Sequence, residues 1–364
     1  MRKIAYVDEL AFTKRHGGSA TATIKISSCL HELKGFDTEI FSFSNGIKTN
    51  IPDKIKFLPN LREIFVFPFI GSKLISNLEK EYDLIHFSST TTTTFRKSCI
   101  PTVLTAHCIF SRQTKILKES LPLYYNLIFN KMSYNLFKEL ERRSFKNIDH
   151  IIVPKTALKK FLVVELRIPC GKISIIAQGI DTEFFKPLDD QADKDDSVLF
   201  VGRGSIAKGF DILIQATDLI KTNIIAVTPH ISRLCKRMAE KKRNLTLITS
   251  KLDHSELVKL YQKATVFIMP SLSETGPLVT LEAMGCGLPI VCTSEGGGDF
   301  VENDINGFVV PNRDLVALAE KVNYILDNKD IAQRFGKESR KRAESFSIRN
   351  TAEKTAAIYH SLGI

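Results

Sequence analysis

Short apolar runs alternate with longer segments of helical spacing along the whole chain. In the first half these runs are IAYVDEL (4–10), TEIFSFS (38–44), LIHFS (84–88), PTVLTAH (101–107) and HIIVP (150–154). In the second half they are SVLFVGR (197–203), NIIAVTP (223–229), LTLIT (245–249), TVFIMP (265–270) and PIVCTS (289–294). Apolar strands that alternate with helices are typical of parallel sheets covered on both faces. The pattern predicts an α/β chain with two Rossmann-like domains.

Two further segments complete this outline. Residues from about Ile348 to Leu362 have the spacing of an amphipathic helix. The acid-rich stretch DDQADKDD (189–196) lies between the two sets of strands, and we interpret it as a solvated linker rather than a metal site.

The composition indicates a soluble globular protein. The chain has 364 residues, of which 43% are hydrophobic, and this length allows two cores. Its densest apolar run, IFVFPFI (64–70), is far shorter than the roughly eighteen residues of a membrane span. Acidic residues near the N-terminus argue against a signal peptide. Seven cysteines without metal-ligand spacing fit reduced thiols, so we expect a cytoplasmic location.

The net positive charge of the chain comes entirely from its first half. Residues 1–186 hold 28 Lys and Arg against 17 Asp and Glu, whereas residues 187–364 hold 23 of each kind. This asymmetry suggests that the N-terminal domain meets an anionic partner, such as phospholipid or a phosphorylated acceptor. No nucleic-acid motif is visible, so we expect no nucleic acid.

A helix start flanked by two carboxylates lies in the segment SLSETGPLVTLEAMGCGLPIV (271–291). Glu274 precedes the predicted helix, Pro277 is favoured in its first turn, and Glu282 lies within it. Free amides at the helix start would hold a phosphate and leave one carboxylate on each side for hydroxyls, as a nucleotide-sugar requires. Two alternatives stay open: the helix dipole alone favours such glutamates, and a glycosidase pair is conceivable but needs one protonated acid.

A glycine-rich loop in VGRGSIAKGFDILIQA (201–216) brings two cations together. Arg203 and Lys208 beside free amides suit a diphosphate. The dinucleotide fingerprint is not met, because Ala207 stands where its third glycine belongs, and this disfavours a nicotinamide dehydrogenase. Taken alone, the loop is also explained as a surface loop with ordinary cations.

The two motifs together resemble those of the family-4 retaining glycosyltransferases, which have the GT-B fold. In that family a Gly-Arg strand end and a following Lys-Gly supply the donor diphosphate with an Arg and a Lys, here Arg203 and Lys208. The family's Glu-x7-Glu motif matches Glu274 and Glu282, and LEAM-x-x-G-x-P (281–289) continues it. The resemblance implies that Glu274 contacts the donor sugar and Glu282 the ribose, in two Rossmann-like domains whose parallel sheets face across a cleft.

Further matches cover most of the chain. HGGSATA (16–22) resembles the family's glycine-rich loop, DLIHFS (83–88) directs His86 to the cleft, and TAHCIF (105–110) carries His107 where a His contacts the donor sugar. A lone His at a strand end is more often structural, but ligands bind at the carboxyl ends of parallel strands, and this favours His107. The implied domains are 1–178 with the crossover helix 348–364, for the acceptor, and 179–347, for the nucleotide-sugar.

The resemblance implies four catalytic residues, namely His107, Glu274, Arg203 and Lys208. The implied donor-binding residues are Gly17, Gly18, Gly202, Arg203, Lys208, Glu274, Gly276, Pro277, Leu278, Val279 and Glu282. Neither a metal nor a cofactor is expected, because no His has metal-ligand spacing and the nucleotide-sugar is a substrate. The sequence departs from the family at Cys108, usually Asp, and at Gln178, usually Asn, and these changes bear on the identity of the donor.

The expected activity is retaining transfer of a sugar from a nucleotide-diphosphate-sugar, with UDP favoured over GDP, to a saccharide or lipid-linked acceptor in cell-surface glycan or glycolipid synthesis. The alternatives are a nucleotide-sugar-binding protein without catalysis and a GT-B-fold sugar-nucleotide epimerase, which lacks the Glu-x7-Glu helix start.

A basic, aromatic-rich helical stretch around PLYYNLIFNKMSYNLF (122–137) could place the protein peripherally on the inner face of an anionic membrane. An ordinary core-facing helix explains the same pattern. The cations are Arg112, Lys115, Lys118, Lys131, Lys138, Arg142, Arg143 and Lys146.

Overall fold

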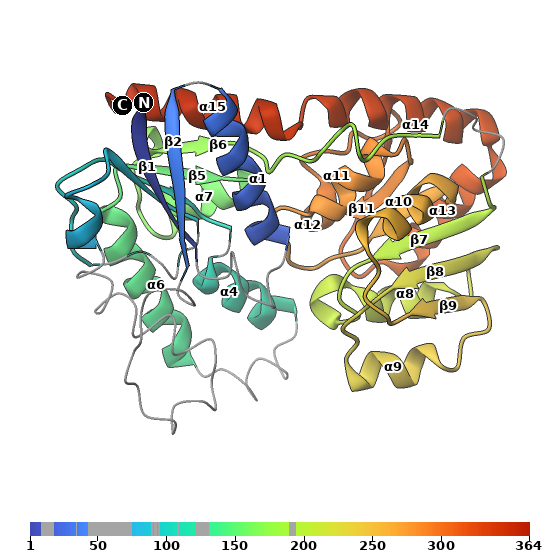
Figure 1. Cartoon of the computed structure of the whole chain (residues 1–364). Helices are drawn as coiled ribbons and strands as arrows, with labels where there is room; N and C mark the ends of the chain where they lie inside the picture. The colour runs from blue at the N-terminus through green and yellow to red at the C-terminus, as the bar shows by residue number, and fades with distance from the viewer. Residues whose placement is uncertain are drawn as a thin grey trace. The chain divides into compact units, whose positions relative to one another are not determined.

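The computed structural model describes residues 1–8, 18–33, 35–42, 75–88, 90, 93, 95–107, 109–120, 131–188 and 194–364. The chain divides into two compact units (Figure 1). Unit 1 comprises Met1–Gly179 and Ile348–Ile364, and unit 2 comprises Ile180–Ser347.

Unit 1 is built on a parallel sheet of six strands in the order β2-β1-β3-β4-β5-β6. The strands are β1 (Arg2–Asp8), β2 (Phe36–Ser42), β3 (Leu84–Phe87), β4 (Thr102–Thr105), β5 (His150–Val153) and β6 (Ile173–Ile175). The helices are α1 (Gly18–Glu32), α4 (Phe110–Ser120), α6 (Lys131–Lys146), α7 (Thr156–Val164) and α15 (Ile348–Ser361). A short 3-10 turn, η3 (Cys170–Lys172), precedes β6.

The two faces of this sheet bury different side chains because successive residues of a strand point to opposite sides. One face carries Val7, Phe87 and Leu104, which form an apolar core with residues of α6 and α7. The other face carries Tyr6 and His86, whose side chains meet Tyr359 of α15. Helix α15 also packs along α1. The C-terminal helix therefore completes the core of unit 1.

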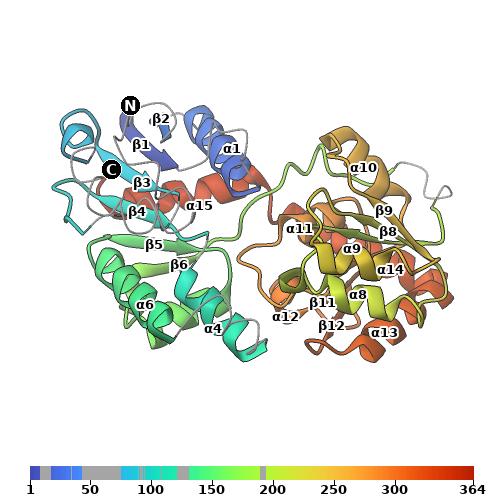
Figure 2. The same ribbon diagram turned by 90° about the horizontal axis from the view of Figure 1, so that it is seen from below.

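Unit 2 contains a second parallel sheet of six strands, in the order β12-β11-β10-β7-β8-β9 (Figure 2). The strands are β7 (Ser197–Val201), β8 (Asn223–Val227), β9 (Leu245–Ile248), β10 (Val266–Met269), β11 (Ile290–Thr293) and β12 (Gly307–Val310). The helical segments are η5 (Ile206–Lys208), α8 (Phe210–Ala216), α9 (Arg233–Ala239), α10 (His254–Lys263), α11 (Leu278–Gly285), α12 (Ser294–Gly297), α13 (Leu315–Asp327) and α14 (Lys329–Glu344).

The predicted fold class is confirmed, since both sheets are parallel and carry helices on their faces. Every apolar run expected to be a strand overlaps one. The sequence pattern missed β6 and β12, which have three and four residues and whose first residues follow a turn rather than a long apolar run. The predicted C-terminal helix corresponds to α15.

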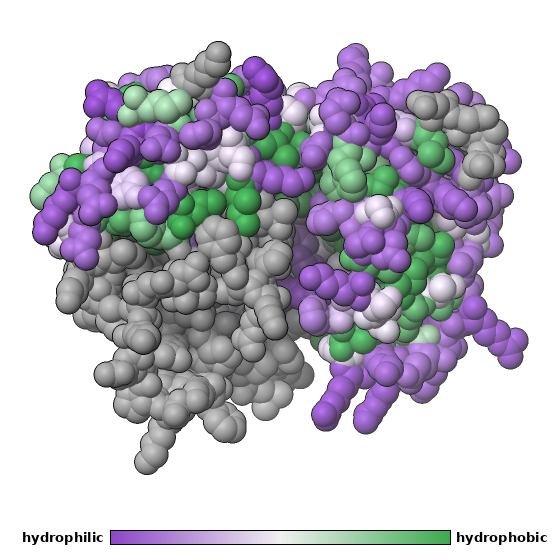
Figure 3. All heavy atoms as spheres, in the orientation of Figure 1, coloured by the Kyte–Doolittle hydropathy of each residue, from purple (hydrophilic) through white to green (hydrophobic). Residues whose placement is uncertain are grey.

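Hydrophilic residues cover much of the described surface in the view of Figure 3. Within the described part of the chain, no helix combines the length and apolar character needed to cross a bilayer.

Candidate active site

Strands β7 and β10 are neighbours at the point where the order of the second sheet reverses. From β7 the chain continues outward to β8 and β9, and then returns to β10 on the other side of β7. In open parallel sheets the loops at the carboxyl ends of two such strands diverge, and ligands bind in the space between them. The two motifs from the sequence, after β7 and after β10, therefore meet at this point.

The loop after β7 presents an arginine to solvent. Gly202 donates its backbone N–H to Val227, and so continues the pairing of β7 with β8. Arg203 follows with an exposed side chain that forms no ion pair with any described residue. Its guanidinium group is therefore available to an anion from outside the protein.

Lys208 and Glu274 form an ion pair across the two loops. Both side chains are mostly buried, at 16% exposure for Lys208 and 9% for Glu274. Ser271 Oγ donates a hydrogen bond of 3.2 Å to the same carboxylate. Two residues that are 66 positions apart in sequence are thus joined at the strand ends. The family resemblance implies that such a lysine and glutamate contact the same donor molecule.

Backbone hydrogen bonds join the same loops. The N–H groups of Leu272 and Ser273 both donate to the carbonyl of Ala207, at 3.0 and 3.2 Å. Because Ala207 immediately precedes Lys208, these bonds hold the lysine close to the segment that carries Glu274. The backbone, and not only the ion pair, fixes the geometry of the two charges.

The start of α11 leaves fewer free amides than the sequence suggested. Pro277 is the N-cap residue, without a side-chain cap. The N–H of Leu278 donates to Gly276 at 2.9 Å, and that of Thr280 donates to Pro277 at 3.0 Å. Val279 has no backbone partner for its N–H among the described residues. The Val279 amide is therefore better placed than the Leu278 amide to receive an anion.

Glu282 does not stand alone on α11. The hydroxyl of Tyr261 donates to its carboxylate at 3.0 Å, and this tyrosine is fully buried on α10. Burial raises the pKa of the Tyr261 phenol well above its ordinary value, so the hydroxyl keeps its proton and acts as a donor. The sequence analysis did not identify Tyr261, because no local pattern reports a contact between α10 and α11.

His107 lies just beyond β4 in unit 1, where its half-buried ring contacts Gln178. The Gln178 side-chain amide approaches Nδ1 of the imidazole. Burial lowers the pKa of His107 to about 4, and the nearby carboxylate of Asp8 opposes that shift. His107 is therefore neutral near pH 7. Gln178, which the sequence marked only as a departure from the family pattern, is its direct partner.

His86 has a structural environment. Its Nδ1 contacts the hydroxyl of Tyr359 at 2.5 Å, and its Nε2 contacts that of Thr105 at 2.7 Å. The Tyr359 hydroxyl also bonds that of Tyr6 at 2.8 Å. Burial lowers the pKa of His86 to about 3. With both ring nitrogens occupied inside unit 1, His86 holds α15 on the sheet rather than facing a ligand.

Part of the predicted N-terminal loop lies outside the described residues. His16 and Gly17 are among these undescribed residues. Cys108, which follows β4, also lies outside the described residues. Gly18 is the first residue of α1. Among the residues that are described, no three His, Cys, Asp or Glu side chains gather as metal ligands would.

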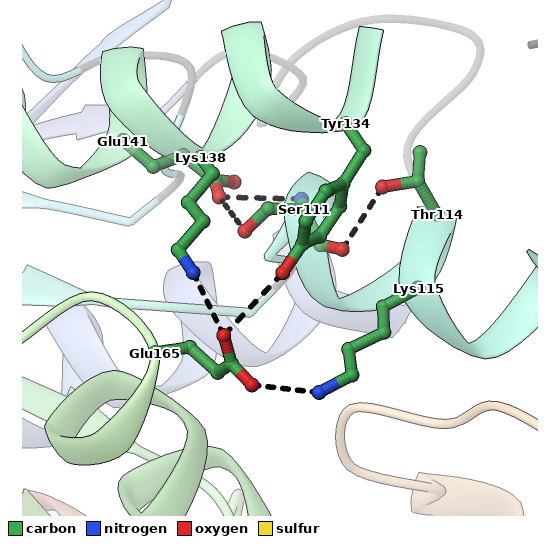
Figure 4. Close-up of polar contacts among 7 residues, drawn as sticks. All are labelled: Ser111, Thr114, Lys115, Tyr134, Lys138, Glu141 and Glu165. Carbon is green, nitrogen blue, oxygen red and sulfur yellow. Dashed lines mark hydrogen bonds and ion pairs between the residues drawn. The ribbon is translucent and has the colours of Figure 1, made fainter. Parts of the chain in front are cut away.

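Four of the eight cations of the basic stretch on α4 and α6 are paired with acids of the same unit, and Figure 4 shows two of these pairs. Glu165 binds the ammonium groups of Lys115 at 2.6 Å and of Lys138 at 2.8 Å. Glu139 binds Arg142 and Arg143. Residues 122–130 of the predicted aromatic-rich stretch lie outside the described residues, whereas Phe137 is buried on α6. These ion pairs reduce the charge that the stretch offers to an external anion.

The two parallel six-stranded sheets are those of the GT-B fold, and comparison with known proteins relates both halves of the chain to glycosyltransferases. The model of the family "Glycosyltransferase Family 4" matches residues 16–184. The model of "Glycosyl transferases group 1" matches residues 181–342, which include both loops described above. The two matches meet at residues 181–184 and together cover residues 16–342, so each half of the chain is similar to one of these glycosyltransferase families.

Individual relatives and structures agree with this assignment. The chain is 26% identical over 313 residues to the sulfoquinovosyl transferase of Arabidopsis thaliana, covering 81% of this chain and 60% of that protein. A glycogen synthase of Mycobacterium tuberculosis is 32% identical over 204 residues, covering 52% of this chain and 48% of that protein. The chain thus spans about half the length of the curated relatives it matches.

The sucrose-phosphate synthase of Thermosynechococcus elongatus has the same fold. Its structure superposes with a TM-score of 0.79 at 20% identity, over 100% of this chain and 99% of that one. At this level of identity the likeness concerns the fold alone.

Proposed function

We propose that the protein is a retaining glycosyltransferase that transfers a sugar from a nucleotide-diphosphate-sugar to a saccharide or lipid-linked acceptor. The observation that carries this proposal is the ion pair of Lys208 and Glu274 at the switch point between β7 and β10. The exposed Arg203 and the start of α11 belong to the same two loops. A cation pair for the diphosphate and a carboxylate for the sugar are thus present in one place.

Binding of the donor would exchange one ionic contact for another. The diphosphate would take the ammonium group of Lys208, joined by Arg203 as a fork-shaped donor to phosphate oxygens. Glu274 would then be released from Lys208 and accept hydrogen bonds from the sugar hydroxyls. Glu282, held by Tyr261, would bind the ribose hydroxyls with its remaining acceptor sites.

Retention of the anomeric configuration is the finer part of the proposal and rests on the family resemblance. The acceptor oxygen attacks the anomeric carbon on the side from which the nucleoside diphosphate leaves. The departing phosphate oxygen takes the acceptor's proton, so the step needs no protein base. Arg203 and Lys208 stabilise the negative charge that develops on the leaving group, which is the main electrostatic demand of the reaction.

The nature of the donor and acceptor draws support from the relatives. HepE of Anabaena, which shares the fold with a TM-score of 0.69, has been solved with UDP-glucose. This supports UDP over GDP as the donor nucleotide. The relatives named as a sulfoquinovosyl transferase and a D-inositol 3-phosphate glycosyltransferase support the transfer of a sugar. The saccharide or lipid-linked acceptor, in glycan or glycolipid synthesis, rests on the family resemblance.

A set of three variants tests the role of the ion pair. Lys208→Met leaves Glu274 buried without its counter-ion, so loss of stability and loss of function would both follow. The double variant Lys208→Met/Glu274→Gln has no unpaired buried carboxylate and so avoids this loss of stability. We expect the double variant to melt near the wild type but to bind UDP-sugars poorly. Recovery of both stability and donor turnover in the double variant would mean that the pair serves only the fold.

Lys221→Met is the matched control, since Lys221 forms an ion pair with Asp327 and precedes β8 at the opposite end of the sheet. A thermal-shift panel of UDP-, GDP- and ADP-sugars identifies the donor, because a ligand that binds the native state raises its melting temperature. Proton NMR of the first product then reports the anomer. An inverted product would contradict retention.

The same panel separates the two alternatives. A binding protein without catalysis would be stabilised by a nucleotide-sugar and form no product with any acceptor. An epimerase would release free nucleotide without an acceptor. Membrane association is tested by sedimentation with neutral and anionic liposomes, and binding that ignores lipid charge would contradict an electrostatic contact.

A further inference from the structure

The contact between Gln178 and His107 indicates which nitrogen of the imidazole ring carries the hydrogen. A neutral imidazole has one nitrogen that donates and one that accepts. The Nε2 of Gln178 is an amide nitrogen and can only donate, and it lies against Nδ1 of His107. Nδ1 must then be the acceptor, and the ring hydrogen must sit on Nε2.

We propose that Gln178 fixes His107 in the tautomer that carries its hydrogen on Nε2, so that His107 offers the substrate a neutral N–H donor and not a base. This inference rests on the proposed function, because it assumes that the protein binds a sugar substrate. Gln178 acts here as a positioning residue.

The surroundings hold Gln178 in place for this role. It is buried and is the third residue after β6. On one side, Thr351 of α15 donates to the carbonyl of Ala177 at 3.0 Å. On the other side, Ile180 donates its N–H to Phe346 at 2.9 Å. The backbone around Gln178 is therefore fixed on both sides, which directs its amide toward the histidine.

Nε2 of His107 has no hydrogen-bond partner among the described residues, and the side chain is only half-buried. A cavity of about 20 Å³ lies beside the ring and is lined by both His107 and Gln178. That volume holds about one water molecule. A hydroxyl oxygen of a sugar is an acceptor that such an N–H would bind.

The charges around the ring agree with a neutral donor. The carboxylate of Asp8 on β1 acts electrostatically on His107, and His107 interacts electrostatically with His86 on β3. Asp8 accepts a hydrogen bond from Ser88. Protonation of Nδ1 would set an N–H against the N–H of Gln178, so the amide itself opposes the imidazolium form.

Nitrogen NMR of the protein labelled with ¹⁵N-histidine tests the tautomer directly. The His107 signals are identified by their absence in the variant His107→Gln. We expect a protonated Nε2 and an unprotonated Nδ1 at pH 7. A hydrogen on Nδ1 would overturn the proposal, whether or not the protein transfers sugars, so this result is independent of the proposed function.

The variant Gln178→Glu provides the second measurement. A carboxylate can only accept, so it should draw the hydrogen to Nδ1 and raise the pKa of His107 by about one to three pH units. With a donor that the wild type uses, kcat/KM should fall about tenfold for the lost hydrogen bond. The pH profile of kcat/KM for Gln178→Glu should also show a titration step that the wild-type profile lacks.

Gln262→Glu is the control, since Gln262 donates to the backbone of Lys186 in unit 2 and the substitution adds the same charge. We expect it to leave the His107 signals and the pH profile unchanged. A Gln178→Glu protein whose His107 keeps the wild-type tautomer and pKa would also overturn the proposal. If this variant does not fold, the wild-type measurement decides the matter.

Discussion

Gly209 lies directly against the carbonyl group of Pro270: a Cβ atom at this glycine would stand 1.9 Å from that oxygen. Its backbone has a φ of +64°, in the left-handed region. The loops after β7 and β10 can therefore approach each other only because residue 209 has no side chain. This approach brings Lys208, the preceding residue, to Glu274.

Substitution of Gly209 by alanine should separate the two loops. The positive φ costs the variant roughly 1–3 kcal/mol of stability, and the overlap with Pro270 adds to it. Displacement of Lys208 by even 1 Å should weaken donor turnover by about tenfold or more. Gly171→Ala is the control, because a Cβ there meets no atom within 4 Å. UDP titration calorimetry on both variants provides the measurement, and unchanged affinity in Gly209→Ala would contradict the role of this contact.

Arg203→Ala should affect the ligand and spare the fold. The side chain is exposed and unpaired within the described protein, so the melting temperature should stay near that of the wild type. A charged hydrogen bond contributes about 1.5–3 kcal/mol, so affinity for UDP should fall roughly 10- to 150-fold. Affinity for uridine, which has no phosphate, should not change. Arg243→Ala is the control, because Arg243 is also exposed but precedes β9, at the opposite end of the sheet from the loop of Arg203. Equal losses for UDP and uridine would rule out a diphosphate contact.

Tyr359→Phe tests how α15 is held on unit 1. The substitution removes the hydroxyl shared by His86 and Tyr6 and leaves buried polar atoms without their partner. We expect a loss of about 1–3 kcal/mol in the free energy of unfolding, measured with urea. Tyr324→Phe, at an exposed site, should cost almost nothing. Equal stability of the two variants would mean that the hydroxyl network does not stabilise the C-terminal helix.

Glu141 should make stability depend on pH. This buried carboxyl group receives hydrogen bonds from the N–H groups of Phe110 and Ser111 at the start of α4, and Figure 4 shows its contact with Ser111. Burial raises its pKa from 4.5 to about 7, and these hydrogen bonds oppose the shift. Because the folded-state pKa is the higher one, the contribution to stability is fully present below pH 4.5 and is lost as pH rises through 7.

The measurement is the difference in the free energy of unfolding between the wild type and Glu141→Gln across this range of pH. Relative to the variant, the wild type should lose roughly 3 kcal/mol between pH 4 and pH 8. Two parallel curves would show that Glu141 is not the titrating group.

The features that depend on local sequence could be predicted without the structure. Ten apolar runs predicted ten strands, because a strand buried on both faces needs apolar residues at every position. The helix start near Pro277 followed from its turn chemistry, and the motifs around Arg203 and Glu274 indicated a diphosphate-sugar ligand. Helix α15 was predicted from its spacing alone.

Only the tertiary structure decided which side chains meet. Glu282 bonds Tyr261, His107 contacts Gln178, and His86 is bound by Tyr359, 273 positions away. The periodicity of a strand indicates which face a residue occupies, but the partner on that face depends on the order of strands and on the helix that covers them. Hydrogen bonds and ion pairs act over a few ångströms, so contacts between distant residues are set by how the sheets and helices pack.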